Sequence, residues 1–391
     1  MKNILLIIAI LILFISFSLS AQTTLKSQLK DGNPTDNLLS YIKRVTQFGE
    51  RADWSHDGKK ILFIEKTYGD VYEVELATGK ISLITGHFYH GGFTRALYLA
   101  NGDILLSRCT SFDASRPHIN RQINAELWVL DKNHTKSPVR LGTKCSEGPA
   151  VSRKNMKIAW TVVSNQYPDS LKKGQYLFNM ADIVYENEKP ELANIKVIFD
   201  NTGTPYRDIE VQNFVPPDEK TMIFSGYNYQ GTEVMMLNLE TGVVTNMSNA
   251  DNQYDEPEGI FPDGKYCCVE CDRETGAVDI YKLKLDGNGD LVRITNFSDY
   301  KGYKSSNPVI SDDGKFMAFQ LAKSTDLAGI GYGIFIMDLK KAKKQRPLVL
   351  CCSKQKPSLH LPIKNVWHHP LLCGVSSTKS IPLPSERDLK H

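Results

Sequence analysis

Histidine is scarce in this chain, and its distribution is uneven. The sequence has nine histidines, and none lies between positions 135 and 359. More than half of the chain therefore offers no imidazole as a metal ligand or general base. The sequence also lacks the G-x-S-x-G, H-E-x-x-H and P-loop patterns. These absences argue against a nucleophile-elbow hydrolase, a zincin and a P-loop nucleotide-binding protein.

A strong excess of charge of one sign is also missing. The formal net charge is +3, and 23% of the residues are charged. Such a balance does not indicate a nucleic acid or an anionic membrane surface as a partner. We therefore expect no nucleic-acid partner.

Long hydrophobic runs are absent apart from one at the N-terminus. Lys2 precedes an apolar run at positions 4–19, which ends in the small residues Ser20 and Ala21. The run is shorter than the roughly 20 residues that a spanning helix needs. The pattern predicts a signal peptide over residues 1–21, a periplasmic or secreted protein, and no membrane span after cleavage. An uncleaved anchor is the alternative.

The eight cysteines lack the spacing of a disulfide framework. Cys267, Cys268 and Cys271 share one expected strand, on which neighbouring side chains point to opposite faces. Zinc binding by Cys268 and Cys271 is the alternative, but residues three apart on a strand also face opposite ways. We expect buried free thiols, and neither a metal nor another cofactor.

Short β segments separated by turn residues are abundant. Between positions 254 and 296, apolar or alternating runs are separated by Pro-Asp-Gly, by a polar turn and by a Gly/Asn/Asp turn. The four runs cover positions 259–261, 265–270, 278–285 and 291–295. Four strands in about forty residues are typical of one blade of a β-propeller.

Five further copies of this pattern can be aligned with the first. Their first turns lie at positions 54–58, 101–103, 154–155, 217–219 and 312–314. The copies predict an all-β, six-bladed propeller of four-stranded antiparallel sheets, with a seven-bladed ring as the alternative. A blade cannot bury both of its faces alone, and ring closure supplies the missing neighbour. We expect a monomer.

The repeat divides the chain into four parts. Residues 1–21 are the expected signal peptide, and 22–45 form a lead-in in which 38–45 are expected to be a strand or a short helix. Residues 46–344 form the propeller. Residues 345–391 contain six prolines and little alternation, which predicts an irregular, largely disordered tail. Either the lead-in or residues 347–352 supply the last outer strand.

Three of the first turns resemble a known family. The sequence W-S-H-D-G-K-K-I-L-F at positions 54–63 resembles the TolB-like propeller repeat, whose turn reads Trp-Ser-Pro-Asp-Gly. Positions 261–265 and 310–315 resemble it too, whereas the second, third and fourth copies have degenerate turns. The resemblance covers about residues 46–340 and implies the fold. Such propellers serve as periplasmic binding modules, as appendages to peptidases and as carbohydrate-active enzymes, so it implies no single function.

Oligogalacturonate lyases are seven-bladed relatives in this resemblance. They use a His-rich manganese site, a catalytic histidine and an arginine. The present chain departs from that pattern, because the later blades contain no histidine. A metal-free variant would need His87, His90 or His118 as its base.

Counting back from each first turn identifies residues at the starts of the innermost strands. This count places Arg51 and Arg95 on adjacent blades and Pro257 on a later one, where Glu256 and Glu258 flank it in an acidic cluster. Neighbouring guanidinium groups suit a carboxylate or phosphate on a ligand. The alternative is an Arg–Glu ion-pair network that closes the channel mouth.

Histidine and arginine are concentrated around the connection between the first two blades. His87 and His90 lie in a loop with aromatic residues and glycines, and Arg116 and His118 lie in a later insertion. These side chains could contact a ligand or stack on a sugar ring. Together with Arg51, Arg95, Glu256 and Glu258 they form the predicted ligand-binding set.

The function predicted from the sequence is that of an exported binding module. Its partner would be a protein or a polar, acidic oligosaccharide at the channel mouth. The alternative is a carbohydrate-active enzyme, either a lyase or a hydrolase, that works in the same place.

Overall fold

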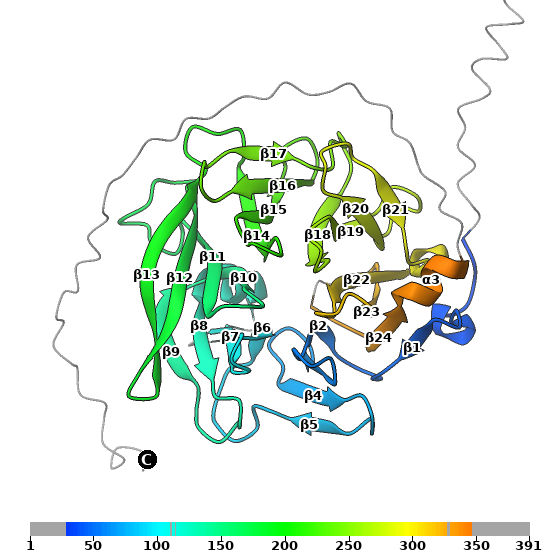
Figure 1. Cartoon of the computed structure of the whole chain (residues 1–391), viewed down its shortest axis with the longest axis horizontal. Helices are drawn as coiled ribbons and strands as arrows, with labels where there is room; N and C mark the ends of the chain where they lie inside the picture. The colour runs from blue at the N-terminus through cyan, green and yellow to red at the C-terminus, as the bar shows by residue number, and fades with distance from the viewer. Residues whose placement is uncertain (1–28, 110–111, 114, 327–328, 346–391) are drawn as a thin grey trace, which may run out of the picture.

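The computed structural model describes residues 29–109, 112–113, 115–326 and 329–345, and in them six four-stranded sheets stand around a central axis (Figure 1). Within each sheet, neighbouring strands pair antiparallel. The predicted all-β, six-bladed propeller is therefore confirmed, and the seven-bladed alternative is wrong for the part of the chain that the structure describes.

Each blade is built from four strands in chain order, except the last. The first three blades comprise β2 (Glu50–Trp54), β3 (Lys60–Ile64), β4 (Val71–Glu75) and β5 (Ile81–Leu83); β6 (Phe93–Tyr98), β7 (Ile104–Cys109), β8 (Ala125–Leu130) and β9 (Val139–Lys144); and β10 (Ser146–Val151), β11 (Lys157–Val163), β12 (Tyr176–Glu186) and β13 (Lys189–Asp200).

The remaining blades and the helical segments follow the same order. They are β14 (Asp208–Phe214), β15 (Thr221–Tyr227), β16 (Glu233–Asn238) and β17 (Val244–Asn246); β18 (Asp255–Ile260), β19 (Tyr266–Cys271), β20 (Asp279–Lys284) and β21 (Leu291–Arg293); and β22 (Tyr303–Ile310), β23 (Phe316–Lys323) and β24 (Ile334–Asp338). The helical segments are η1 (Pro34–Asn37), α2 (Pro117–Ile119), η2 (Asn120–Asn124), η3 (Phe297–Asp299) and α3 (Leu339–Gln345).

The N-terminal lead-in closes the ring. Strand β1 (Ile42–Arg44) pairs with β24 as the outer strand of the sixth blade, with Ile42 opposite Met337. Of the two expected closing segments, the lead-in therefore supplies the outer strand, and β1 covers an edge of β24 that would otherwise be open. The other expected segment, residues 347–352, lies outside the described residues, as do the predicted signal peptide and the tail beyond residue 345. Among the described residues, no helix is both long and apolar enough to cross a bilayer.

The hydrophobic core is divided among the blade interfaces. Six clusters of buried apolar residues occur, and each joins two neighbouring blades. Cys267 lies in the cluster between the fourth and fifth blades, whereas the adjacent Cys268 lies between the fifth and sixth. Both faces of a blade are thus buried only because a neighbour stands on each side. The five described cysteines are buried free thiols.

The aspartates of the Asp-Gly turns accept hydrogen bonds from the backbone of their own turns. The carboxylate of Asp57 accepts the backbone N–H of Lys59 at 3.0 Å, and the same contact recurs in the fifth and sixth blades. Gly58 has a φ of +67°, which glycine adopts without the steric cost that a side chain would bring. These aspartates hold the turns and lie away from the channel.

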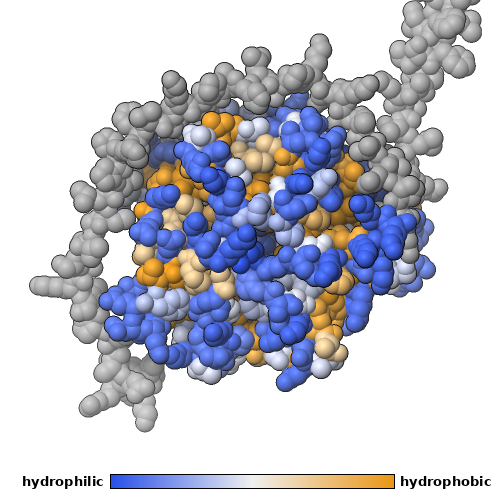
Figure 2. Space-filling view, viewed as in Figure 1, coloured by the Kyte–Doolittle hydropathy of each residue, from blue (hydrophilic) through white to orange (hydrophobic). Residues whose placement is uncertain are grey.

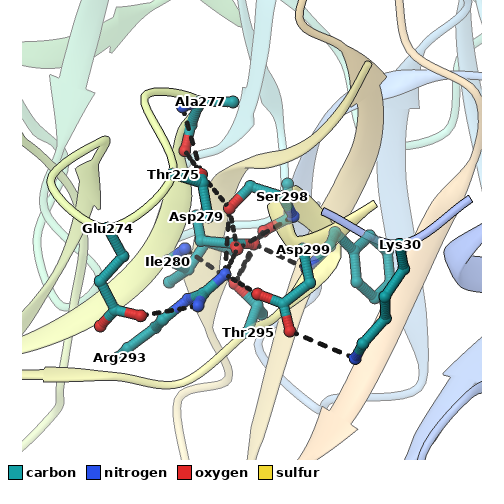
Figure 3. Close-up of polar contacts among 12 residues, drawn as sticks. Lys30, Glu274, Thr275, Ala277, Asp279, Ile280, Arg293, Thr295, Ser298 and Asp299 are labelled. Atoms are coloured by element: carbon teal, nitrogen blue, oxygen red, sulfur yellow. Dashed lines mark hydrogen bonds and ion pairs between the residues drawn. The ribbon is translucent and has the colours of Figure 1, made fainter. Parts of the chain in front are cut away.

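A second recurring contact joins the outer strands, and the sequence analysis did not predict it. A Ser or Thr hydroxyl beyond the fourth strand accepts a backbone N–H at the start of the third strand, at 2.8–3.0 Å. In the fifth blade Thr295 accepts from Ile280, and the buried carboxylate of Asp279 accepts from Thr295 and Arg293 (Figure 3). This contact ties the segment that follows the outer strand back to the third strand of the same blade.

The third blade has a long outer hairpin. Strand β12 begins at Tyr176 and ends at Glu186, and β13 begins at Lys189. Asn187 and Glu188 connect the two strands with φ values of +48° and +64°. Such a two-residue turn normally contains glycine. Because glycine is absent from this turn, the sequence pattern did not indicate the hairpin.

Candidate functional site

A β-bulge interrupts the innermost strand of every blade. In each case the pairing between the first and second strands shifts register near the middle of the first strand. A bulge bends its strand and re-aims a side chain. Arg51, Glu147 and Asn307 lie at three of these bulges with φ values of +54°, +64° and +47°. Backbone strain of this kind is costly and tends to occur at functional sites.

Two cavities meet at the bulges. The upper cavity, of about 1040 Å³, lies at the starts of the innermost strands, and the lower cavity, of about 240 Å³, lies towards their ends. Both cavities are lined by the same five residues, which we call the constriction: Arg51, Arg95, Glu210, Glu258 and Asn307. Hydrophilic side chains surround the centre of the ring face in Figure 2.

The upper cavity is rich in charges of both signs. Six carboxylates line it, from Glu147, Asp208, Glu210, Glu256, Glu258 and Glu270. Six cationic side chains line it as well, from Arg51, Arg95, Arg121, Lys173, Arg207 and Lys304. The formal charges of these twelve side chains therefore cancel, and the positions of the charges decide what the cavity can bind.

Opposite charges at the constriction are not paired with one another. Among the described residues, no N···O contact of 4.0 Å or less joins Arg51 or Arg95 to Glu210 or Glu258. The one ion pair of Arg51 is with the adjacent Glu50, at 3.5 Å from Nε to Oε1. This arrangement does not fit the alternative of an Arg–Glu network that seals the channel.

Arg51 is buried with unsatisfied donors. Its exposed fraction is 8%, and its Nε and Nη1 groups have no hydrogen-bond partner among the described residues. Burial lowers the pKa of Arg51, but the negative fields of Glu50 and Glu147 outweigh that effect, so the pKa is raised and the group stays charged. A buried guanidinium with unused N–H donors is costly unless a partner occupies the space in front of it.

Arg95 lies against the backbone of the third blade. A Cβ at Gly148 would come within 2.5 Å of Arg95 Cγ, so only glycine leaves room for the arginine in this position. No hydrogen bond or ion pair of Arg95 occurs within the described part of the chain, and its side chain is half-buried. Both arginines thus present free donors at the floor of the upper cavity.

Carboxylates and tyrosines of the fourth and fifth blades form a cluster on the same floor. The Tyr227 hydroxyl contacts Glu256 and lies 3.1 Å from Glu210 Oε2, and the Tyr254 hydroxyl donates to Glu256. We call Glu210, Glu256, Glu258, Glu270 and these two tyrosines the acidic cluster.

Burial and mutual repulsion hold protons on the acidic cluster. Burial, followed by the field of Glu256, raises the pKa of Glu258 to about 7, although Arg95 opposes the shift. Burial and the nearby Glu258 raise the pKa of Glu270 to about 8, and the pKa of Glu210 is raised for the same reasons. Asn307 donates to both Glu258 and Glu270, at 3.1 and 2.6 Å. At neutral pH the cluster is therefore partly protonated.

The structure brings together four of the eight predicted site residues. Arg51, Arg95, Glu256 and Glu258 all line the upper cavity. The count from the turn had placed Pro257 at the level of Arg51, but the bulge in β18 puts Glu258 there instead.

The other four predicted residues do not line either cavity. His90 Nε2 contacts Asp70 at 3.0 Å, and His87 Nε2 contacts the Lys136 carbonyl at 3.1 Å. Arg116 pairs with Asp113 on the surface, and His118 is exposed. Their part in ligand binding stays a prediction. No group of three or more potential metal ligands occurs among the described residues.

The sequence analysis missed the second-strand members of the site. Glu270 ends the apolar run of β19 and Tyr227 ends β15, and both side chains turn into the upper cavity. A charged residue inside an otherwise apolar strand, such as Glu270, is a signal that could have been used. Glu210 on β14 carries the same signal between Ile209 and Val211.

The lower cavity ends in a charged network that joins three blades. Arg153 of the third blade donates to Asp312 at 2.8 Å and to the Trp54 carbonyl at 2.7 Å, and its Nη1 lies 3.3 Å from Asp53 Oδ2. His56 contacts Asp312 through Nδ1 and the Leu99 carbonyl through Nε2, both at 2.9 Å. We call Asp53, His56, Arg153 and Asp312 the lower network.

His56 is expected to make stability pH-dependent. Its hydrogen bond to Asp312 raises the pKa of His56, although burial and Arg153 oppose the shift. The stabilisation is fully present below the unfolded-state pKa of about 6.5 and is lost as the pH rises through the raised folded-state value. His56→Gln should therefore destabilise the protein more at about pH 6 than at about pH 9.

Urea unfolding of both proteins across this range measures the difference. His118→Gln, at an exposed position, is the control for a histidine change outside the network. A destabilisation by His56→Gln that stays constant with pH would contradict the proposed charge state of His56.

Comparisons with known proteins assign this chain to no family. No protein-family model and no curated protein matches the sequence. Similar solved structures include TolB from Acinetobacter baumannii (17% identity, TM-score 0.43, 74% of this chain and 65% of that chain). Others are an oligogalacturonate lyase from Vibrio parahaemolyticus (12%, 0.44, 74% and 80%) and a gluconolactonase from Xanthomonas campestris (10%, 0.48, 76% and 88%). The chain thus spans just under two thirds of TolB, and its likeness to these proteins concerns the propeller fold without assigning a family.

Proposed function

We propose that the protein is an exported binding module whose upper cavity holds an acidic oligosaccharide. The cavity volume of about 1040 Å³ is at the upper end of the range for small-molecule sites, which is about 300–1,000 Å³. Hydroxyl and amide groups on its wall, such as those of Tyr176, Asn165 and Asn228, suit the hydroxyls of a sugar. The apolar N-terminal run with its small-residue end supports export.

The unpaired donors of Arg51 and Arg95 carry this proposal. Two guanidinium groups on adjacent blades reach the same floor, and neither uses its donors on the glutamates across the channel. A carboxylate accepts two parallel N–H bonds from a guanidinium, and each charged hydrogen bond is worth about 1.5–3 kcal/mol. A uronic-acid residue provides such a carboxylate on a hydroxyl-rich ring.

Arg95→Gln should weaken the binding of an acidic oligosaccharide by about 10- to 100-fold, because it removes one charged hydrogen-bonding group. Calorimetric titration with tetragalacturonic acid and with maltotetraose measures the effect of the carboxylates. Only the acidic sugar should bind the native protein tightly. Arg95 is preferred to Arg51 as the test because its guanidinium is less buried.

Arg140→Gln is the matched control, since Arg140 is an exposed arginine on β9 that lines neither cavity. It should leave the affinity unchanged. Equal binding of the acidic and neutral sugars, or full affinity in Arg95→Gln, would contradict the proposal. Binding of a protein from the native envelope with no sugar binding would replace the oligosaccharide by a protein partner.

One observation favours a carbohydrate-active enzyme as the second candidate. Glycoside hydrolases use one carboxylic acid that keeps its proton near neutral pH and one ionised carboxylate. Glu258, with its pKa raised to about 7 by burial and by Glu256, meets the first requirement. Release of reducing ends or unsaturated products from acidic glycans, abolished by Glu258→Gln, would establish this alternative over the binding module.

A further inference from the structure

The two kinds of charge at the constriction come from opposite sides of the ring. Arg51 and Arg95 lie on the first and second blades, and Glu210 and Glu258 lie on the fourth and fifth (Figure 1). In a ring of six blades, the first stands opposite the fourth and the second opposite the fifth. We call Arg51 and Arg95 the cationic wall. We call Glu210, Glu256 and Glu258 the anionic wall, and it faces the cationic wall across the floor of the upper cavity.

Both walls have groups that are not fully satisfied. Nη1 of Arg51 has no acceptor among the described residues, and its Nε has only the 3.5 Å ion pair with the adjacent Glu50. On the other wall, the described donors to Glu210, Glu256 and Glu258 are neutral hydroxyl and amide groups. The charged and titratable groups around these three carboxylates are Arg51, Arg95, Glu147, Glu270, Tyr227 and Tyr254.

Lys304 does not neutralise the anionic wall through an ion pair among the described residues. It lines the upper cavity, and its field acts on Glu270, but it forms no ion pair with any carboxylate there among the described residues. The anionic wall thus relieves its repulsion by holding protons. A ligand cation would relieve the same repulsion, as a ligand anion would satisfy the arginines.

We propose that the upper cavity recognises an acidic amino sugar, with its carboxylate on Arg51 and Arg95 and its protonated amine on Glu210, Glu256 and Glu258. This inference rests on the proposed function and specifies its ligand. A sugar with both groups offers a charged partner to each wall, whereas an acidic sugar without an amine leaves the anionic wall unpaired. The amine also explains why the floor of an anion site contains so many carboxylates.

The test uses muramic acid, which has one carboxylate and one free amine, together with N-acetylmuramic acid and glucosamine. Each comparison sugar lacks one of the two charges. Muramic acid should bind at least about tenfold more tightly than either, because each lost charged contact costs at least that factor. Calorimetry in two buffers of different ionisation enthalpy should show proton release with muramic acid and much less with N-acetylmuramic acid, since only the amine ionises the acidic cluster.

Glu258→Gln tests the assignment to the anionic wall, because it removes the negative charge and keeps the size of the side chain. It should remove the preference for muramic acid without weakening the binding of N-acetylmuramic acid. Glu188→Gln, in the exposed turn between β12 and β13, is the control. Thermal unfolding of each variant shows whether the fold is intact, and Glu256→Gln is the second variant if Glu258→Gln does not fold.

The outcomes separate this inference from the proposed function. If muramic and N-acetylmuramic acids bind equally, and Arg95→Gln weakens both, the amine site is wrong and the carboxylate site stands. If none of the acidic sugars binds, or if Arg95→Gln has no effect on them, both proposals fail. A tripeptide with free termini that binds where the three sugars do not would also overturn the assignment to an amino sugar.

Discussion

Asp279→Ala is expected to lower the free energy of unfolding by about 3–5 kcal/mol, the usual cost of removing one partner of a buried ion pair. The Asp279 carboxylate is 1% exposed and is the centre of the contacts in Figure 3. It accepts from the hydroxyls of Ser298 and Ser305, at 2.6 and 2.7 Å, and forms an ion pair with Arg293. It also accepts the backbone N–H groups of residues 297 and 298, each at 3.0 Å.

The size of the effect follows from what remains after the substitution. Two backbone N–H groups lose their acceptor, and alanine offers none. Arg293 loses one of its carboxylate partners and keeps Glu274 and Asp299. Ser305 lies near the start of β22, the innermost strand of the sixth blade, so the loss weakens the contact between the last two blades. The structure therefore predicts a larger effect than that of an ordinary ion pair on the surface.

Urea unfolding of the purified variant measures this loss. Asp251→Ala changes an exposed aspartate in a loop and should alter the unfolding free energy by less than about 0.5 kcal/mol. An Asp279→Ala protein as stable as the Asp251→Ala protein would show that this network does not hold the ring together.

Arg153→Met is the second substitution with a large expected cost, again about 3–5 kcal/mol at neutral pH. It removes the cation that joins Asp53 and Asp312, which come from the first and sixth blades. Asp53 is 3% exposed, and its pKa is raised by burial although Arg153 lowers it. Without Arg153, the buried carboxylate has to take up a proton or stay ionised at a high cost.

The pH dependence distinguishes this charge effect from a packing defect. Without Arg153 the folded-state pKa of Asp53 rises further, so the destabilisation is largest above that pKa and decreases as the pH falls through it. Addition of Asp53→Asn to Arg153→Met should recover part of the stability, because the buried charge is then gone. Lys154→Met, at the next and more exposed position, is the control.

Unfolding curves at about pH 5 and about pH 8 provide both comparisons. A cost for Arg153→Met that is the same at both pH values, and that is not reduced by Asp53→Asn, would indicate lost packing. It would then exclude the charged lower network as the element that joins the three blades below the cavities.

The architecture could be predicted from the sequence because it repeats. Three blades are marked by a turn such as Asp57-Gly58, in which glycine provides the positive φ and the aspartate carboxylate accepts the backbone N–H two residues on. The other three have degenerate forms of the same turn. Outer strands were harder to predict, since the hairpin at Asn187 and Glu188 has no glycine. Local turn chemistry thus determined the number of blades and the start of each second strand.

The candidate site could be predicted only in part, because its residues are placed by contacts between distant segments. Arg51 and Arg95 were predicted by counting from the turns, and both line the upper cavity. The count pointed to Pro257, but the bulge in β18 places Glu258 at the cavity instead. Glu270 reaches the cavity from the second strand of the same blade. Neither displacement follows from a local pattern.

The sequence by itself determined an all-β chain of repeated four-strand units, since a Pro-Asp-Gly type of turn and period-two alternation are local properties. Which charged side chains face one another depends on the tertiary structure, because closure of the six-bladed ring by β1 places the first blade opposite the fourth. The same closure buries Arg51 and Glu210 in one channel, where Nη1 of Arg51 has no acceptor among the described residues and burial raises the pKa of Glu210.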